Sequence, residues 1–205
     1  MKLYPSISRS TGQQFQEFDA YVFDKLDGSN LRVEWTRKRG WFKYGTRARL
    51  FDETDEVFGG AIPLFKETLA GGIEKVARDE RWDQVTVFME FWGEKSFAGL
   101  HEPGDPKKLT LFDVNPYKKG ILGPRQFLDL FDGLPIPRLL GRIKWTRGFV
   151  EEVRLGKIPN ITFEGVVGKG GKGHDLVMAK AKTQAWTDKV MEKFGMLEGQ
   201  KILVS

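Results

Sequence analysis

Residues 21–30 read Tyr-Val-Phe-Asp-Lys-Leu-Asp-Gly-Ser-Asn, and this short segment carries more chemical information than any other in the chain. An apolar strand delivers Lys25 at its end, where desolvation and nearby cations lower the pKa of an ammonium group and expose a nucleophilic amine. Asp27 is suited to orient that amine or to help hold a metal ion, and Gly28 permits a tight turn and a close approach by phosphate. The same pattern also fits a salt-bridged lysine before an ordinary Asp-Gly turn.

Further acids and lysines lie in runs that are otherwise apolar. Glu90 interrupts the run Phe-Met-Glu-Phe-Trp, and Glu164 interrupts the run Phe-Glu-Gly-Val-Val. A buried carboxylate is costly unless a cation, a metal ion or a hydrogen-bond donor compensates it. Lys180 and Lys182 share one face of a predicted strand, where two ammonium groups repel each other unless an anion lies nearby. Each feature alone fits a solvated edge strand, but together they indicate one site for anions and a metal ion.

Composition narrows the possible chemistry. The 205 residues carry a net charge of +5 with a sequence pI near 9.3, which suits a polyanionic partner such as nucleic acid. The absence of cysteine excludes disulfides and thiolate chemistry, and two histidines, His101 and His174, disfavour a multi-histidine metal site. No apolar run approaches the ~20 residues of a membrane helix, and residues 1–10 lack the apolar core of a secretory signal. The composition therefore leaves the chemistry of carboxylates and lysines as the basis for any reaction at a site in this chain.

Local patterns predict the elements of one α+β domain over residues 1–205. Alternating runs rich in aromatic and β-branched residues predict strands over 21–25, 31–35, 41–44, 85–92, 109–114, 161–169 and 176–182. Helical spacing and capping residues predict helices over 63–82 with a break at Gly71-Gly72, 124–131, 146–155 and 183–194. Turns at 38–40 and in the Gly-rich loop 168–173 predict two hairpins. We therefore expect packed, mainly antiparallel sheets with helices outside.

Taken in order, these segments resemble the motifs of the covalent nucleotidyltransferases, which comprise ATP-dependent DNA ligases, RNA ligases and mRNA capping enzymes. The matching segments are Lys25–Asn30, Thr46-Arg47, Glu90, residues 109–114 with Phe112, residues 164–167 and Lys180-Ala-Lys182. They span most of the chain. The resemblance implies an ATP-grasp-like nucleotidyltransferase (adenylyltransferase) domain.

The residues around the lysine resemble one branch of that family. Asp24 directly before Lys25, and Asn30 in the first motif, resemble the RNA ligases that seal nicked duplex RNA, including the RNA-editing ligases. DNA ligases more often place their adenine-contacting acid two residues before the lysine, where this chain has Phe23. The resemblance implies an ATP-dependent RNA ligase that joins 3′-hydroxyl and 5′-phosphate ends, in nicked duplexes or single strands, through lysyl-AMP and an adenylylated end.

The same resemblance implies a role for each site residue. Lys25 would attack the α-phosphorus of ATP, while Lys180 and Lys182 would stabilise the transition state and lower the pKa of Lys25. Mg²⁺ or Mn²⁺ is expected at Asp27 and Glu164, largely through water. The other expected contacts are Asp24 and a stacked Phe112 with adenine, Glu90 with a ribose hydroxyl, Arg47 with phosphate, and Asn30 in sealing.

One departure from the family and three alternatives stay open. Residues 183–205 are too few for the OB-fold or extra domain that many relatives carry after the last of these motifs. We therefore expect a bare catalytic domain, monomeric and cytoplasmic, that grips a nick by its own basic surface or with an accessory protein. The alternatives are a minimal ligase of DNA or RNA/DNA-hybrid nicks, a GTP-dependent capping-type enzyme, and a non-catalytic domain whose binding to nucleic acid depends on nucleotide.

Overall fold

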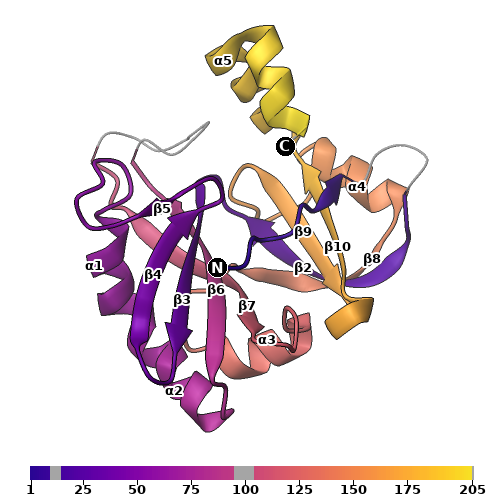
Figure 1. The fold of residues 1–205 in the computed structure, drawn as a ribbon. Coiled ribbons are helices and arrows are strands. Elements are labelled where there is room, and N and C mark those ends of the chain that lie inside the picture. Colours follow the sequence, from indigo (N-terminus) through magenta and orange to yellow (C-terminus); the bar gives the residue numbers. More distant parts are fainter. Residues whose placement is uncertain (10–14, 95–103, 205) are drawn as a thin grey trace.

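Two five-stranded sheets dominate the computed structural model, which describes residues 1–9, 15–94 and 104–204 (Figure 1). Sheet 1, which contains Lys25, has the strand order β1-β10-β9-β2-β8, and sheet 2 has the order β5-β4-β3-β6-β7. Neighbouring strands are antiparallel except for β1 and β10, which are parallel. The expected α+β class with mainly antiparallel sheets is confirmed.

The strands of each sheet come from distant parts of the sequence. Sheet 1 contains β1 (Ser8–Arg9), β2 (Phe18–Lys25), β8 (Leu139–Trp145), β9 (Gly165–Gly170) and β10 (Val177–Lys182). Sheet 2 contains β3 (Ser29–Thr36), β4 (Gly40–Thr46), β5 (Leu50–Phe51), β6 (Gln84–Trp92) and β7 (Lys108–Pro116). The chain passes from sheet 1 to sheet 2 between β2 and β3, which is the segment that follows Lys25.

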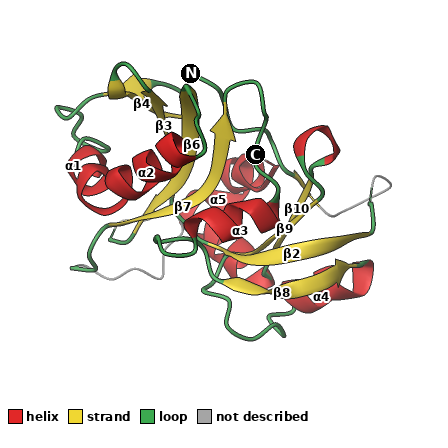
Figure 2. Cartoon of the chain, turned by 90° about the horizontal axis from the view of Figure 1, so that it is seen from below, coloured by secondary structure: helices red, strands yellow, loops and turns green. Residues whose placement is uncertain are grey.

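Some helices pack on the faces of the two sheets that point away from each other, while others lie elsewhere (Figure 2). The helical elements of the described residues are α1 (Ala61–Phe65), the π-helical turn η1 (Lys66–Ala70), α2 (Gly71–Asp79), α3 (Pro124–Phe131), α4 (Arg147–Arg154), the 3-10 turn η2 (Gly173–Asp175) and α5 (Gln184–Val204). The core of sheet 2 packs Val33 and Trp35 against α1 and α2, and the core of sheet 1 packs Val22 and Val166 against α4. Each sheet therefore has its own apolar core.

Local sequence signals set the limits of several helices. Pro124 is the first residue of α3, where its missing N–H costs no hydrogen bond. The Thr146 side chain accepts a hydrogen bond from the Phe149 N–H and caps α4, and Gly156 follows the helix with a φ of 69°. Gly195, with φ 72° and ψ 171°, ends the first helical segment of α5 as predicted, but the chain then continues in a second segment.

Two sequence predictions of secondary structure are wrong. The predicted break at Gly71-Gly72 is absent because Gly71 has helical angles, φ −63° and ψ −45°, so α1, η1 and α2 form one run. Gly72 instead permits close packing, since a Cβ there would lie 2.6 Å from the Leu134 side chain. The predicted strand over 161–169 begins only at Gly165, because a φ of 143° at this glycine turns the chain into β9. His101 lies outside the described residues.

The N-terminal segment, residues 1–7, connects the two sheets. Arg32 of β3 donates a hydrogen bond to the Lys2 carbonyl oxygen at 3.0 Å, and the Tyr4 hydroxyl donates to Asp113 of β7. The following strand, β1, then pairs with β10 of sheet 1. In Figure 1 the N-terminus accordingly lies between the sheets, and its ammonium group is 3.5 Å from Glu34 of β3.

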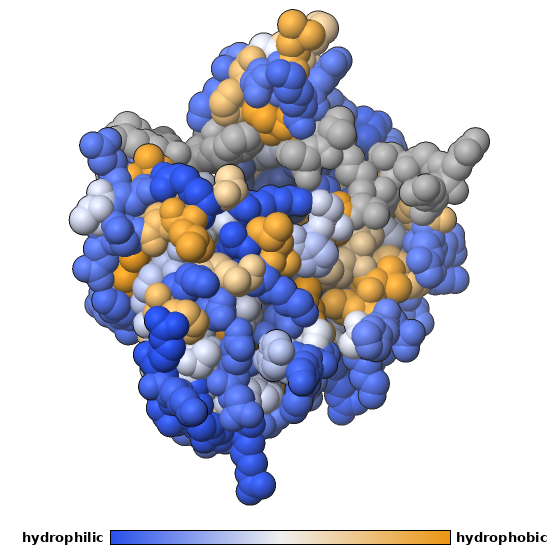
Figure 3. All heavy atoms as spheres, in the orientation of Figure 1, coloured by the Kyte–Doolittle hydropathy of each residue, from blue (hydrophilic) through white to orange (hydrophobic). Residues whose placement is uncertain are grey.

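The surface is mostly hydrophilic on the face that Figure 3 shows, with apolar residues in small groups. Apolar residues also show at the projecting end of the molecule, where α5 is found and where Met196 and Leu197 are exposed. None of the helices in the described part of the chain is long and apolar enough to cross a membrane.

Candidate active site

Two adjoining cavities lie between the sheets, and the ten residues predicted for the site all line one or both of them. The apolar cavity contains Asp24 and Phe112, with Phe23, Leu26, Pro137, Val167 and Lys169. The charged cavity contains Asp27, Arg47, Glu164, Lys180 and Lys182, with Trp186 and Ile202. Lys25, Asn30, Glu90, Tyr4 and Ile7 line both. The structure thus brings all ten residues together, while their chemical roles stay predictions.

The last residue of β2, Lys25, points into both cavities and forms an ion pair. Its Nζ donates a hydrogen bond to Glu164 Oε2 at 2.8 Å, and Lys182 Nζ lies 3.1 Å from the other oxygen, Oε1. The Glu164 side chain is 5% exposed and that of Lys182 is 12% exposed, so water screens these charges poorly. One carboxylate therefore holds the ammonium groups of both lysines.

The pKa of Lys25 differs in direction from the sequence prediction. Burial, the largest single influence, lowers this pKa, but the nearby carboxylates of Glu164, Glu90 and Asp27 together raise it above the ordinary value for lysine. The prediction that Lys180 and Lys182 lower the pKa of Lys25 below its ordinary value is therefore wrong. One reason for this difference is that the ammonium group of Lys182 is itself paired with the Glu164 carboxylate.

Glu90 faces the lysine from the opposite sheet. Burial, helped by the charges of Glu164 and Asp27, raises the pKa of Glu90 to about 8, although Lys25 and a hydrogen bond from the Gly28 N–H oppose the shift. Glu90 is thus mostly protonated at neutral pH. It pairs in register with Asn30 across β6 and β3.

Close packing against sheet 2 requires a glycine at position 28, in the turn after Lys25. A Cβ on Gly28 would clash with the Phe91 carbonyl oxygen and with the Trp92 side chain. Gly28 therefore lies directly against the last residues of β6. This contact packs the end of β2 against sheet 2 and brings Glu90 close to Lys25.

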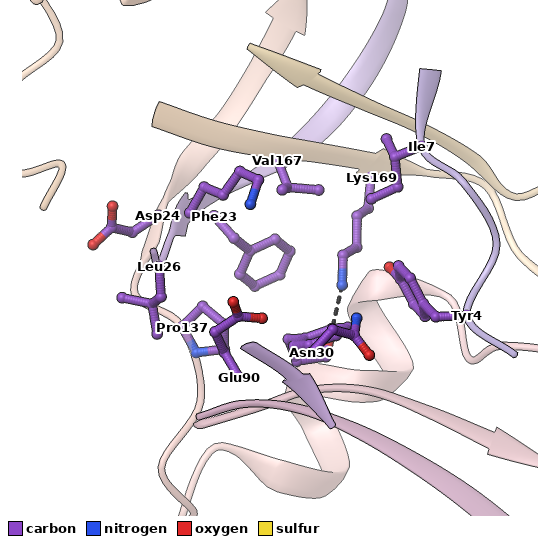
Figure 4. Close-up of a pocket in the computed structure, with 12 residues that line it drawn as sticks. Tyr4, Ile7, Phe23, Asp24, Leu26, Asn30, Glu90, Pro137, Val167 and Lys169 are labelled. Carbon is purple, nitrogen blue, oxygen red and sulfur yellow. Dashed lines mark hydrogen bonds between the residues drawn. The ribbon is translucent and has the colours of Figure 1, made fainter. Parts of the chain in front are cut away.

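The apolar cavity has walls from both sheets (Figure 4). Val167 of β9 and Phe23 of β2 come from sheet 1, and Phe112 of β7 comes from sheet 2. A flat apolar ligand with polar edges suits such a slot, because side chains on its two walls can contact both faces of a ring.

Sequence reasoning missed a buried lysine that crosses between the sheets. Lys169 of β9 forms an ion pair with Asp113 Oδ1 of β7 at 2.8 Å and donates to the Phe112 carbonyl oxygen at 2.7 Å. The Tyr4 hydroxyl donates to the other oxygen of Asp113. Burial raises the pKa of Asp113, against the opposing effects of Lys169 and Tyr4. A signal existed for Asp113, which interrupts an apolar run as Glu90 does, but no such signal marked Tyr4.

Asp24 reaches the cavity, but its carboxylate is already bound. The Thr162 N–H donates to Asp24 Oδ1 at 2.9 Å, and the Thr162 hydroxyl donates to Oδ2. In Figure 4 this carboxylate points away from the other labelled side chains. Asp24 therefore anchors the segment that precedes Glu164, and its contact with adenine stays a prediction.

Arg47 lies at the exposed rim of the charged cavity, on the turn after β4. Its guanidinium donates a hydrogen bond to the Ser6 hydroxyl of the N-terminal segment. This places one cation near the opening, with Lys180 and Lys182 deeper along β10. The site therefore offers positive charge at several depths, as a polyphosphate requires.

The carboxylates of the charged cavity fit a divalent cation only in part. Among the described residues, no cluster of three or more acidic or histidine side chains could hold a metal ion by itself. Both oxygens of Glu164 are engaged by Lys25 and Lys182. Mg²⁺ commonly binds one or two carboxylates with water and substrate phosphates as its other ligands, and Asp27 and Glu164 suit that mode.

Comparison with known proteins identifies the fold. No protein-family model matches the sequence, and no curated protein is significantly similar to it. A solved archaeal ATP-dependent RNA ligase matches with a TM-score of 0.67 and 17% identity, over 94% of this chain and 51% of that chain. The Naegleria gruberi RNA ligase solved with PPi matches with a TM-score of 0.62 and 17% identity, over 95% and 64%. A mutant of that ligase solved with ATP and Mn gives 0.60 and 18%, over 83% and 51%.

The chain spans about half the length of most of these ligase chains. At such low identity the likeness concerns the fold alone. The α+β arrangement of two antiparallel sheets described above matches that of the nucleotidyltransferase domain in those structures.

Proposed function

We propose, from the nucleotidyltransferase fold that this chain shares with ATP-dependent RNA ligases, that it moves AMP from ATP to Lys25 and then to a 5′-phosphate RNA end. The observation that carries this proposal is the Lys25 amine, 2.8 Å from Glu164 in a cavity also lined by Lys180 and Lys182. An amine nucleophile with fixed cations beside it suits attack on a phosphate, because the cations stabilise the charge that develops there.

In the first step Lys25 Nζ attacks the α-phosphorus of ATP. A nitrogen–phosphorus bond forms while the bond to the pyrophosphate oxygen breaks, and pyrophosphate leaves. Glu164 Oε2 is placed to accept the proton that Nζ loses. Lys182 and Lys180 stabilise the negative charge on the α-phosphate oxygens, and Arg47 at the rim is available to the outer phosphates.

The apolar cavity is suited to the adenine ring. Phe112 and Val167 are placed to contact the two faces of the base, with Lys169 at one edge. Glu90, with a pKa of about 8, carries its proton at neutral pH and can both donate to and accept from a ribose hydroxyl. Asp27 and Glu164 would hold a divalent cation largely through water, and that ion would supply neutralisation of phosphate charge.

In the second step an oxygen of a 5′-phosphate end attacks the phosphorus of the AMP, a phosphorus–oxygen bond forms, and the nitrogen–phosphorus bond to Lys25 breaks, which restores the amine. In the third step a 3′-hydroxyl loses its proton and attacks the phosphorus of the 5′ end, a phosphodiester bond forms, and AMP leaves. Asn30 lies on the cleft side of β3 beside Glu90 and lines both cavities. A residue that lines both cavities can contact a nucleic-acid end that enters the charged cavity. RNA is the proposed substrate because the placement of Asp24 and Asn30 around Lys25 resembles that in the duplex-sealing RNA ligases.

Incubation with ATP labelled at the α-phosphate, followed by a denaturing gel, tests the first step. We expect a covalent label on the protein, with a mass increase of one AMP at Lys25. Lys25→Ala should lose the label, whereas Lys144→Ala, which removes an exposed lysine from β8, should keep it. A label on the Lys25→Ala protein would show that another residue is the nucleophile.

The same assay separates the alternatives. Labelling by GTP instead of ATP would indicate a capping-type enzyme, and an absence of label with retained nucleotide binding would indicate a non-catalytic domain. Sealing of matched nicks in RNA, DNA and hybrid duplexes then defines the substrate. We expect the RNA nick to be sealed fastest.

A further inference from the structure

The ammonium group of Lys182 lies between a carboxylate and an aromatic ring. Its Nζ is 3.1 Å from Glu164 Oε1 and 3.8 Å from the centre of the Trp186 ring. Trp186 is 1% exposed, and it lines the charged cavity together with Lys25. The proposed AMP transfer uses Lys182 and Glu164 but leaves Trp186 without a role.

Thr183, between β10 and α5, fixes this arrangement. Its N–H donates to the Glu164 carbonyl oxygen at 2.9 Å, and its hydroxyl donates to the Phe163 carbonyl oxygen at 2.8 Å. The same hydroxyl accepts a hydrogen bond from the Trp186 N–H at 3.1 Å, which caps the first turn of α5. The backbone therefore holds Glu164 and Trp186 next to Lys182 even when the ion pair between Glu164 and Lys182 opens.

An aromatic face attracts a cation without neutralising it. The attraction comes from the ring quadrupole and strengthens when water is excluded, as it is around Trp186. A second carboxylate in place of the ring would also hold Lys182, but it would cancel the charge that the phosphate needs. The indole Nε1 has no hydrogen-bond partner in the described part of the structure, so the ring, rather than its N–H, makes the useful contact.

We propose that Trp186 is a positioning residue for AMP transfer, holding the Lys182 ammonium beside the α-phosphate with its charge intact. This proposal rests on the proposed function. Glu164 is shared between Lys25 and Lys182. When Lys25 gives up its proton and Glu164 changes its hydrogen bonds, the Trp186 ring keeps Lys182 in place for the transition state.

The test measures the rate of lysyl-AMP formation at several ATP concentrations. Trp186→Leu should lower the maximal rate by about thirty-fold, equivalent to ~2 kcal/mol, with little change in the KM for ATP. Trp186→Phe keeps an aromatic face and should retain most of the rate. In a Lys182→Ala background, Trp186→Leu should have little further effect, because the group that it positions is gone.

Val190→Ala is the matched control for a merely structural role. Val190 is fully buried in the same apolar cluster as Trp186, so its truncation should lower the melting temperature while leaving the rate close to wild type. Equal losses for Val190→Ala and Trp186→Leu, no rescue by Phe, or an undiminished effect in the Lys182→Ala background would each overturn the proposal. Failure of the wild-type protein to form lysyl-AMP would instead contradict the proposed function.

Discussion

Lys25 Nζ lies 2.8 Å from Glu164 Oε2, so the amine proposed as the nucleophile is held as a paired, charged ammonium. Three neighbouring carboxylates outweigh burial and raise the pKa of Lys25. In the proposed reaction, protonated Lys25 attracts the phosphates of ATP and then loses its proton before it attacks.

Glu164→Gln is expected to lower the pKa of Lys25. Burial, which lowers this pKa, would then be opposed only by the weaker influences of Glu90 and Asp27. NMR titration of the Lys25 side chain, assigned by comparison with Lys25→Arg, measures the change. Lys75, whose pKa is raised by an exposed pair with Asp79, serves as the control and should titrate as in the wild type. A higher pKa for Lys25 in the variant would contradict the charge balance described here.

Glu90→Gln is expected to change how stability depends on pH. The folded-state pKa of Glu90, about 8, lies above its ordinary value of 4.5, so the folded protein binds more protons than the unfolded chain between these values. The stability associated with Glu90 is present below pH 4.5 and is lost as the pH rises through 8. The free energy of unfolding should therefore fall with rising pH by at most ~1.4 kcal/mol per pH unit.

Urea unfolding of both proteins at several pH values between about 5.5 and 8.5 checks this expectation. Relative to wild type, Glu90→Gln should become steadily more stable as the pH rises, because Gln cannot lose a proton. The raised pKa of Lys25 does not interfere, since its contribution changes only above about pH 10. Parallel curves for the two proteins would mean that Glu90 titrates normally.

The pair formed by Lys169 and Asp113 should stabilise the contact between the sheets. Lys169→Met alone leaves a buried carboxylate without its partner and is expected to cost about 3–5 kcal/mol of unfolding free energy. The double variant with Asp113→Asn should cost less than the sum of the two single variants, because no uncompensated charge then stays buried. Urea unfolding of the four proteins measures this coupling, and strictly additive losses would argue against it.

Gly165→Ala is expected to prevent correct placement of Glu164. Gly165 has a φ of 143°, and a Cβ there would overlap the Ala181 carbonyl oxygen of β10. We expect a large loss of stability together with loss of lysyl-AMP formation. Gly40→Ala is the control, because Gly40 also has a positive φ, 67°, but has open space around it, so it should cost only about 1–2 kcal/mol. Similar effects of the two substitutions would show that packing against β10 is unimportant.

Much of the secondary structure could be predicted because the local sequence preferences agree with the tertiary structure. The alternation in β2, β3, β6 and β7 was sufficient to predict them, since each has one face in an apolar core. The strand β8 has the sequence Leu-Leu-Gly-Arg-Ile-Lys-Trp and was not predicted. The reason is that it is an edge strand with exposed positions, and that its glycine, Gly141, has a φ of 149°. The two-residue strands β1 and β5 are too short to show any period.

The composition of the site was predictable for a different reason. Its residues come largely from strand ends, where an acid or a lysine in an apolar run stands out from the sequence. The direction of the Lys25 pKa shift was not predictable, because it depends on how many carboxylates the fold brings near one amine. The contacts of Asp24 with Thr162, and of Lys169 with Asp113, likewise join residues that lie far apart in the sequence.

Asn30→Ala is expected to separate sealing from the earlier formation of lysyl-AMP. Asn30 lies on the cleft side of β3 beside Glu90, whereas the Lys25 amine and the lysines of β10 that are proposed to act on the α-phosphate belong to sheet 1. Labelling by ATP should therefore stay within about threefold of wild type, while joining of a nicked RNA that already carries a 5′-AMP should fall by about tenfold or more. Asn30→Gln, which keeps the amide but moves it by one methylene, should recover little sealing if the position of the amide matters. Equal losses in labelling and in sealing would instead place Asn30 with the nucleotide.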